Sequence, residues 1–397
     1  MKKKLKLLFV VLVGMFMMLA ACSQNSTGGS SNGGGGKGKD GENVVNIGFT
    51  GPLSGPAASY GEKALSGMKL AVEEINETGL EVDGKKYKLN LVSLDDKYLP
   101  NEAAANAQRL VQENKTPIVY TPHSGGIMAL QVFNEKDNFI IGAYSSEPTI
   151  TESGNKLTVR IPPRYDGYIE PFTKYSMERF GKKLAAIPTV TQYGKDWAEV
   201  LLPYWKKSGG DVVYESAVDF TKDTDFFTIL TNALEKDPDV LFIGGPSEPT
   251  AKLAKQAREL GFKGGFIVMD QAKLDEMKAV TDNSYEMLEG AIGTIPLVDA
   301  GYPGTDQFVE KYREKYGSDP GAEAGFHYMS VYIFVEAMKA AGSVDNPTEI
   351  HKHIQDALDA LPDDKKVYEV PSIDEKGGFV IPVRVAAIEE GKIVYIE

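Results

Sequence analysis

The segment Pro117–Gly126, with the sequence PIVYTPHSGG, carries the pattern on which the fold prediction depends. Its apolar run Ile118–Tyr120 is typical of a buried parallel strand. The run ends before Pro122, because proline cannot donate to a sheet ladder and disfavours helix in the preceding residue. Ser124–Gly126 then opens a stretch with helical spacing of apolar residues. A strand, a turn of small residues and a helix in succession predict an α/β sheet.

Ser124 has two possible roles at this turn. A helix start presents free backbone N–H groups to an anion, and the Ser124 hydroxyl would add a further donor. Alternatively, Ser124 only caps the helix. The stretch by itself leaves both roles open.

From Val44 onward, short β-rich runs alternate with amphipathic helical runs in two similar series, separated by Ile161-Pro162-Pro163. This alternation predicts parallel sheets covered by helices. We therefore expect an α/β protein with two Rossmann-like lobes and a cleft between them. The predicted strands are 44–49, 87–94, 118–120, 139–144, 184–190, 212–218, 240–243, 266–269, 291–295, 379–388 and 392–396. The predicted helices are 59–77, 101–113, 127–135, 167–180, 197–207, 226–236, 250–260, 305–316, 326–341 and 348–361.

The first 21 residues have the features of an export signal. A lysine-rich start precedes the apolar run Leu7–Leu19, which is too short to span a membrane as a stable helix. The run ends in Ala20-Ala21-Cys22, which resembles the cleavage box of bacterial lipoproteins. Because Cys22 is the only cysteine, no intrachain disulfide can form. We expect cleavage before Cys22, lipidation of its thiol, and an extracytoplasmic protein anchored to the cell membrane by that lipid.

Residues 22–43 are rich in glycine and almost free of apolar side chains, which predicts a flexible tether. Removal of the lysine-rich signal changes the formal net charge from −13 to −17. Such an acidic chain is unsuited to nucleic acid, so we expect no nucleic-acid partner.

Motifs of covalent and metal chemistry are missing from the sequence. From Val44 onward there is no G-x-G-x-x-G after a strand, no Walker loop, no H-E-x-x-H and no G-x-S-x-G. His351 and His353 are two apart on a predicted helix, so they face different directions and do not make a metal pair. His123 adjoins Ser124, but neighbouring residues rarely meet as a catalytic dyad. We expect no catalytic residue, no metal and no cofactor, and hence no enzyme.

Polar and aromatic residues instead follow the predicted strands in both series, where open α/β sheets bind small ligands. The candidate ligand-binding residues at these turns are Tyr60, Ser124, Tyr144, Ser146, Tyr193 and Asp270.

Four segments resemble the branched-chain amino acid (Leu/Ile/Val) binding proteins of ABC importers: Ile47–Gly61, Gln192–Asp196, Ala257–Gly261 and Asp374–Gly377. The resemblance extends from Val44 to the C-terminus. It implies two lobes joined by three hinge crossings that close on a ligand, a monomeric protein, and ABC permease subunits as partners. We expect a first lobe of 44–163 plus 296–369 and a second of 164–295 plus 370–397.

Transferred to this sequence, the resemblance implies that Ser124 and Ser146 hold the α-carboxylate of an amino acid. Asp270 would pair with its ammonium group, and Tyr60 and Tyr193 would line the pocket for its side chain. Such an assignment is chemically consistent, because a zwitterion needs an anion site and a carboxylate on facing walls.

The sequence departs from the family at four points, which concern the ligand's side chain more than its amino acid head. Ser146 stands where family members often have threonine, and Asp270 where they often have glutamate. Pro246 stands at a position that is often tyrosine, and His123 at one where a small residue is usual. Arg164 has two possible roles, a salt bridge at the hinge surface or a contact with a polar ligand. A receptor-like sensor of the same fold and a binder of a small amide or carboxylate remain alternative functions.

Overall fold

The computed structural model describes residues 36–37 and 43–396. The expected signal peptide, Cys22 and most of the expected tether lie outside the described residues. The described residues belong to one compact unit, Gly35–Glu397.

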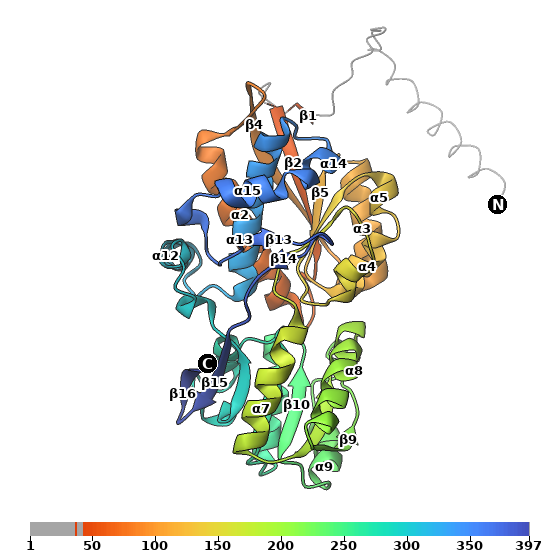
Figure 1. The fold of residues 1–397 in the computed structure, drawn as a ribbon, viewed down its shortest axis with the longest axis vertical. Helices are drawn as coiled ribbons and strands as arrows, with labels where there is room; N and C mark the ends of the chain where they lie inside the picture. The colour runs from red at the N-terminus through yellow and green to blue at the C-terminus, as the bar shows by residue number, and fades with distance from the viewer. Residues whose placement is uncertain (1–35, 38–42, 397) are drawn as a thin grey trace, which may run out of the picture. The chain divides into compact units, whose positions relative to one another are not determined.

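Two large sheets organise this unit, one in each of two lobes (Figure 1). The first sheet has the order β3-β4-β2-β5-β6-β7, with β1 paired to β2. Strands β4, β2, β5, β6 and β7 run parallel, whereas β3 and β1 are antiparallel to their neighbours. The strands are β1 (Gly36–Lys37), β2 (Asn43–Gly51), β3 (Leu80–Val82), β4 (Lys85–Asp95), β5 (Ile118–Thr121), β6 (Ile140–Ala143) and β7 (Thr158–Arg160).

The second sheet has the order β16-β15-β12-β11-β10-β8-β9. Its strands β8 to β12 are parallel, and β15 and β16 extend it as antiparallel strands. The strands are β8 (Lys183–Pro188), β9 (Asp211–Glu215), β10 (Val240–Gly244), β11 (Gly265–Val268), β12 (Ala291–Thr294), β15 (Val385–Glu389) and β16 (Lys392–Ile396).

Apolar side chains on both faces of each central strand explain the layered packing. In β5, Ile118 and Tyr120 pack on one side with the core of α2 and α13. Val119 points to the other side and packs with residues of α3 and α4. The segment that decided the fold prediction is therefore the centre of the first sheet, buried at all four strand residues.

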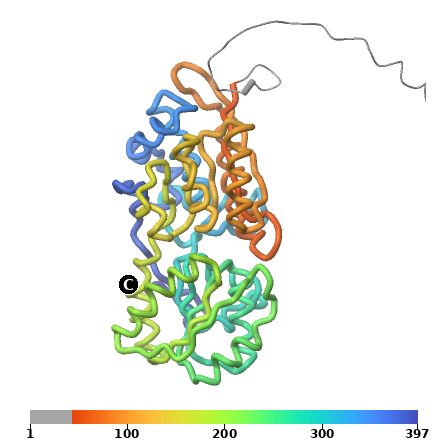
Figure 2. Tube along the Cα trace, turned by 90° about the vertical axis from the view of Figure 1, so that its right-hand side faces the viewer, coloured from red at the N-terminus to blue at the C-terminus, as the bar shows by residue number. Residues whose placement is uncertain are grey.

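The first lobe contains the helices α2 (Ala58–Thr78), α3 (Pro100–Gln112), α4 (Ser124–Gln131), α5 (Asn134–Asp137), α6 (Thr149–Glu152), α12 (Thr305–Tyr316), α13 (Ala322–Ala341), α14 (Pro347–Lys352) and α15 (Ile354–Ala360). The second lobe contains α7 (Ile169–Arg179), α8 (Gln192–Lys207), α9 (Phe227–Leu234), α10 (Ser247–Glu259) and α11 (Leu274–Met277). Figure 2 shows that the early part of the chain and most of its late part share one lobe, while the middle part forms the other, to which β15 and β16 also belong. Helices α2 and α13 approach closely, since a Cβ on Gly67 would lie 2.0 Å from the Ala324 carbonyl oxygen.

The chain crosses between the lobes three times: after β7, after β12, and between β14 (Phe379–Val380) and β15. The prediction of two parallel α/β lobes with three crossings is confirmed. The expected lobe assignment of 370–397 is wrong in its first part. Strand β14 pairs with β13 (Ser372–Ile373), and Phe379 packs in the core of the first lobe, so the crossing lies near Pro382.

Several predicted elements differ from the structure for local reasons. The helix predicted at 127–135 begins at Ser124 and ends at Gln131, after which α5 follows separately. The predicted helix 348–361 is divided at His353, and the predicted strand 379–388 is interrupted around Pro382. Strands β3 and β7 were not predicted, because each has only three residues.

Candidate functional site

One pocket between the lobes brings together all six candidate ligand-binding residues. The pocket lies at the carboxyl ends of strands from both sheets, where open α/β sheets bind small ligands. The candidates that line it are Tyr60, Ser124, Tyr144 and Ser146 from the first lobe, with Tyr193 and Asp270 from the second. All six residues chosen from the sequence thus lie together in one pocket. Their role in ligand binding stays a prediction.

The start of α4 forms the polar wall on the first lobe. Ser124 is the first residue of this helix, and its Oγ lies 2.7 Å from Ser145 Oγ. The N-cap is His123, whose Nδ1 accepts a 3.0 Å hydrogen bond from the Gly126 N–H. The reading of Ser124 as the cap is therefore wrong, and its hydroxyl is directed into the serine pair instead.

His123 is fixed by two bonds that determine its tautomer. Because Nδ1 accepts from Gly126, the ring proton is on Nε2 and is donated to Asp96 Oδ2 at 3.0 Å. Asp96 also accepts from the Thr50 hydroxyl and from the Tyr98 N–H. His123 is thus a neutral side chain that holds the start of α4 in place. Its Nδ1 is occupied by the Gly126 N–H, so it does not act as a base toward the Ser124 hydroxyl.

Asp270 follows β11 and forms the polar wall on the second lobe. Its Oδ1 accepts hydrogen bonds from the Tyr193 hydroxyl and, at 3.1 Å, from Trp197 Nε1. Burial, with the nearby Asp270 carboxylate as a second cause, raises the pKa of Tyr193 far above its ordinary value. Tyr193 therefore keeps its proton and acts as a donor to Asp270.

The two walls are connected across the cleft. Ser146 Oγ lies 3.1 Å from the Tyr193 hydroxyl, which in turn is bonded to Asp270. Since the Tyr193 proton goes to Asp270, Ser146 is the donor in the first bond. Ser146 is expected to hold a carboxylate, and Asp270 is expected to pair with an ammonium group. A single hydroxyl group, that of Tyr193, thus lies between them.

Sequence reasoning missed several residues of this pocket, namely Tyr98, Ser145, Pro162, Gln271 and Lys273. Ser145 and Gln271 adjoin predicted residues and would have been found by extending each turn by one position. Tyr98 and Lys273 carry no local motif and reach the pocket only through folding. Gln271 Nε2 donates to the Tyr98 hydroxyl at 2.7 Å, a second bond between the lobes.

Buried ionic groups next to the pocket also join the lobes. Lys63 Nζ of α2 lies 2.8 Å from Glu276 Oε1 of α11, and the Ser247 hydroxyl donates to Glu276 Oε2 at 2.6 Å. Glu323, at the start of α13, is fully buried beside them. Burial, followed by the nearby Glu276 carboxylate, raises the pKa of Glu323 to about 8.

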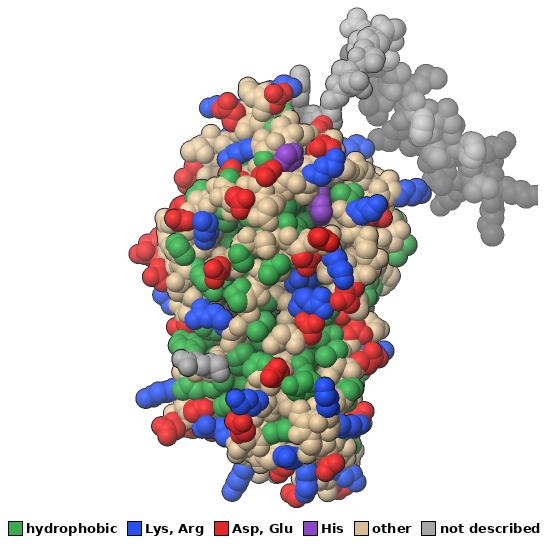
Figure 3. Space-filling view, in the orientation of Figure 1, with side chains coloured by type: hydrophobic (Ala, Val, Ile, Leu, Met, Phe, Trp, Pro, Cys, Tyr) green, Lys and Arg blue, Asp and Glu red, His purple; other side chains and the backbone are tan. Residues whose placement is uncertain are grey.

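Arg164 and Pro246 lie outside the pocket. Arg164 Nη2 is 2.7 Å from Asp166 Oδ2 and 3.0 Å from Glu152 Oε1, which supports the salt-bridge role at the hinge surface. Pro246 precedes α10 and lines a separate hollow. Basic and acidic side chains intermingle on the face drawn in Figure 3.

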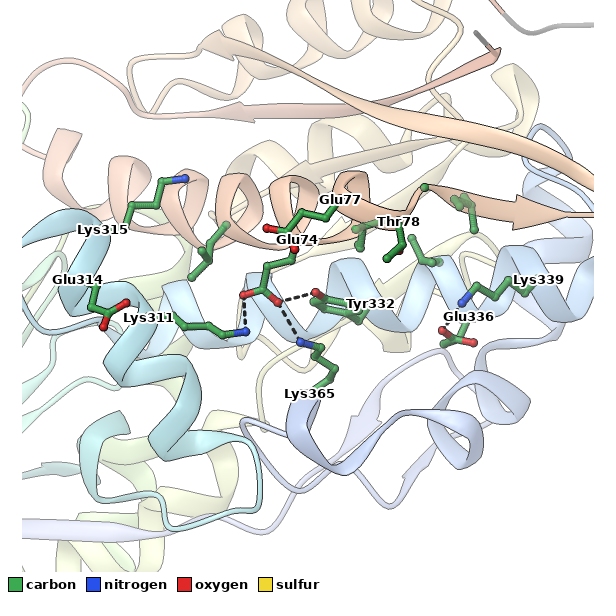
Figure 4. Close-up of a pocket in the computed structure, with 15 residues that line it drawn as sticks. Glu74, Glu77, Thr78, Lys311, Glu314, Lys315, Tyr332, Glu336, Lys339 and Lys365 are labelled. Atoms are coloured by element: carbon green, nitrogen blue, oxygen red, sulfur yellow. Dashed lines mark hydrogen bonds and ion pairs between the residues drawn. The ribbon is translucent and has the colours of Figure 1, made fainter.

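A large groove in the first lobe is centred on Glu74 (Figure 4). Glu74 accepts hydrogen bonds from Lys311 and Lys365 at 2.9 Å each, and from Tyr328 and Tyr332. Burial opposes ionisation, but these four bonds outweigh it and lower the pKa of Glu74 to about 2. The Glu74 carboxylate at the centre of the groove is fully paired, so it joins α2, α12 and α13.

Within residues 36–37 and 43–396, no cluster of His, Cys, Asp and Glu is arranged to hold a metal ion. No helix in this part of the chain is long and apolar enough to cross a membrane.

A profile of the periplasmic binding protein family matches residues 44–392. The chain belongs to the periplasmic binding protein family. This periplasmic binding protein is 30% identical over 306 residues to an amino acid binding protein of Pseudomonas aeruginosa, with 76% of this chain and 80% of the relative covered. It is 24% identical over 314 residues to the Leu/Ile/Val-binding protein of Escherichia coli, covering 78% and 83% of the two chains.

Solved structures show the same fold. A leucine binding protein of Thermotoga maritima has a TM-score of 0.74 at 25% identity, covering 89% of this chain and 98% of its own. A branched-chain amino acid transporter substrate binding protein of Streptococcus pneumoniae has a TM-score of 0.73 at 24% identity, with 89% and 100% covered. The family is extracytoplasmic and non-enzymatic, so this periplasmic binding protein captures solutes and is not an enzyme.

Proposed function

We propose that this periplasmic binding protein captures an amino acid in the pocket between its lobes and delivers it to the permease of an ABC importer. In this proposal it acts as a monomer, tethered outside the cytoplasm by a lipid on Cys22. The relatives' names, which refer to amino acid and Leu/Ile/Val binding, support the ligand class.

The hydrogen-bond chain Ser146–Tyr193–Asp270 is the observation that carries this proposal. In an amino acid the carboxylate and ammonium groups are attached to the same carbon, so their partners must be close together. A ligand that replaces the Ser146–Tyr193 contact can present its carboxylate to Ser124, Ser146 and the start of α4. Its ammonium group can then reach Asp270, whose bonds from Tyr193 and Trp197 both fall on Oδ1.

Charge-assisted hydrogen bonds in such a buried setting contribute about 1.5–3 kcal/mol each. Three of them, together with burial of the ligand, suffice for a dissociation constant near micromolar, which corresponds to about −8 kcal/mol. Tyr60, Tyr144 and Tyr193 would cover the carbon skeleton of the ligand and exclude water from it.

Calorimetry of the mature protein with three matched sets of compounds tests this function: amino acids, their amides, and the acids that lack the amino group. We expect only the free amino acids to bind tightly, and a ligand at 100 times its Kd to stabilise the fold by about 2.7 kcal/mol. Equal affinity for the deaminated acids would show that the pocket binds small carboxylates and would overturn the proposal.

A further inference from the structure

A second compartment opens from the polar pocket toward the crossings between the lobes. The two share Tyr144, Pro162, Asp270 and Lys273 as lining residues. Hinge residues such as Ile295 and Pro382 also line the second compartment. A ligand head held at Asp270 can therefore direct its side chain toward the hinge residues along the lining that the two compartments share.

Aromatic rings of the first lobe form a continuous wall from one compartment to the other. The ring centroids of Tyr60 and Tyr144 are 6.2 Å apart, and those of Tyr144 and Phe326 are 5.9 Å apart. Phe326 stacks on Tyr368 at 3.8 Å, and Tyr302 follows at 6.4 Å. Such rings favour a planar aromatic ligand, which can stack or pack edge to face against them.

Two hydroxyl groups in the second compartment are buried without a hydrogen-bond partner among the described residues. They are Thr294 Oγ1 and the Tyr368 hydroxyl, on side chains that are each 8% exposed. Unpaired polar groups in a protein interior are costly, and each calls for a partner. Both residues line the compartment, so a polar atom of a bound ligand is in a position to pair with them.

The basic groups of this compartment already donate hydrogen bonds within the protein. Arg384 Nη1 donates to the Ala300 carbonyl oxygen at 2.6 Å. Lys273 Nζ donates to the Asp270 carbonyl oxygen and lies near the acidic groups Asp275 and Glu323.

We propose that the ligand is an aromatic amino acid with a polar group at the tip of its ring, for which L-tyrosine is the probe. Its ring lies along Tyr144 and Phe326, and its phenolic hydroxyl pairs with Thr294 and Tyr368. This inference rests on the proposed function. It differs in the ligand's side chain, which is aromatic and not branched aliphatic.

Titration calorimetry of the whole mature chain with L-tyrosine, L-phenylalanine and L-leucine tests the inference. We expect L-tyrosine to bind at least tenfold more tightly than L-phenylalanine, because a buried hydroxyl site rejects an analogue that leaves it unpaired. L-Leucine should bind more weakly than either. If L-leucine binds best, or L-phenylalanine equals L-tyrosine, the inference is overturned while the proposed function stands. If no free amino acid binds, both fail.

Two substitutions that remove a hydroxyl group test whether Thr294 and Tyr368 cause the preference for L-tyrosine. Thr294→Val and Tyr368→Phe should each reduce the preference for L-tyrosine over L-phenylalanine at least threefold and leave L-phenylalanine binding intact. Thr173→Val is the matched control, since the Thr173 hydroxyl is also buried and unpaired among the described residues but does not line this compartment. An unchanged preference in both deletion variants, with folding verified by circular dichroism, would remove the assigned hydroxyl partners and contradict the inference.

Discussion

Ser146 of the first lobe and Tyr193 of the second are joined by a hydrogen bond of 3.1 Å between Oγ and the phenolic oxygen. Tyr193 is also bonded to Asp270, so three predicted ligand-binding residues form one chain across the cleft. If these residues bind the ligand as proposed, ligand binding and lobe closure would use the same atoms. A ligand in place of the Ser146–Tyr193 bond would then hold the lobes together through its own two charged groups.

Asp270 should contribute more to affinity than Ser124. Asp270→Ala removes the carboxylate assigned to the ammonium group and should weaken binding by about 2–5 kcal/mol. Ser124→Ala leaves the start of α4 in place and should cost about 1–2 kcal/mol. Calorimetry gives the ranking, and small-angle scattering shows whether ligand still compacts the Asp270 variant. Asp211→Ala, at an exposed position, is the control. Parental affinity in Asp270→Ala would rule out Asp270 as the ammonium partner.

Arg164 should not influence ligand choice. Its side chain is 34% exposed and is paired with Asp166 and Glu152 at the hinge surface. Arg164→Ala should therefore leave the ranking of ligands unchanged and alter the free energy of unfolding by less than about 1 kcal/mol. Competition binding with a panel of amino acids measures the ranking, with Arg179→Ala as the comparison at another exposed salt bridge. Selective loss of one polar ligand would make Arg164 a contact residue.

Glu74 should stabilise the first lobe without affecting the ligand site. Glu74→Gln removes the charge that holds Lys311 and Lys365, and breaking such a largely buried pair costs about 3 kcal/mol. Because the pKa of Glu74 is lowered to about 2, its stabilisation is present above about pH 4.5 and is lost as the pH falls through about 2. Urea denaturation measures this, and the exposed Glu77→Gln on the same helix is the control. Equal stability of the two variants would contradict the prediction.

Glu323 should make the protein less stable at higher pH. Its pKa is raised from 4.5 to about 8, so between these values the folded chain holds a proton that the unfolded chain has released. The resulting stability is complete below about pH 4.5 and is lost as the pH rises through about 8, by up to about 1.4 kcal/mol per pH unit. Glu323→Gln should flatten this decline in denaturation curves, whereas exposed Glu310→Gln should not. A decline of the same slope in Glu323→Gln would assign it to other groups.

Cys22, which lies outside the described residues, should carry the lipid anchor. Cys22→Ala removes the only thiol in the chain, so the protein should be released from the membrane or remain unprocessed. Cell fractionation and the mass of the mature protein measure this, with Ser23→Ala as the neighbouring control. Normal processing and unchanged membrane association of Cys22→Ala would refute lipid anchoring.

Local pattern was sufficient for the large elements and for the position of the site. Ile118–Tyr120 is apolar at every residue, and this is what a strand covered on both faces requires. Asp270 and Ser124 could be placed because ligand sites of open α/β sheets lie at the carboxyl ends of strands. The hairpin of β3 and β4 was not predicted; its Asp83-Gly84 turn has positive φ at both residues, as such two-residue turns require.

The two-lobed α/β fold and the polar residues at its strand ends could therefore be predicted, because both depend on patterns within short stretches of chain. Which distant side chains meet could be read only from the folded protein. Lys63 pairs with Glu276, and Gln271 with Tyr98, only because the lobes bring α2 and the segment after β4 against the segment after β11. His123 became the cap of α4 because Asp96 fixes its ring. Side-chain partners far apart in sequence have no period to reveal them, since their contact depends on how whole elements pack.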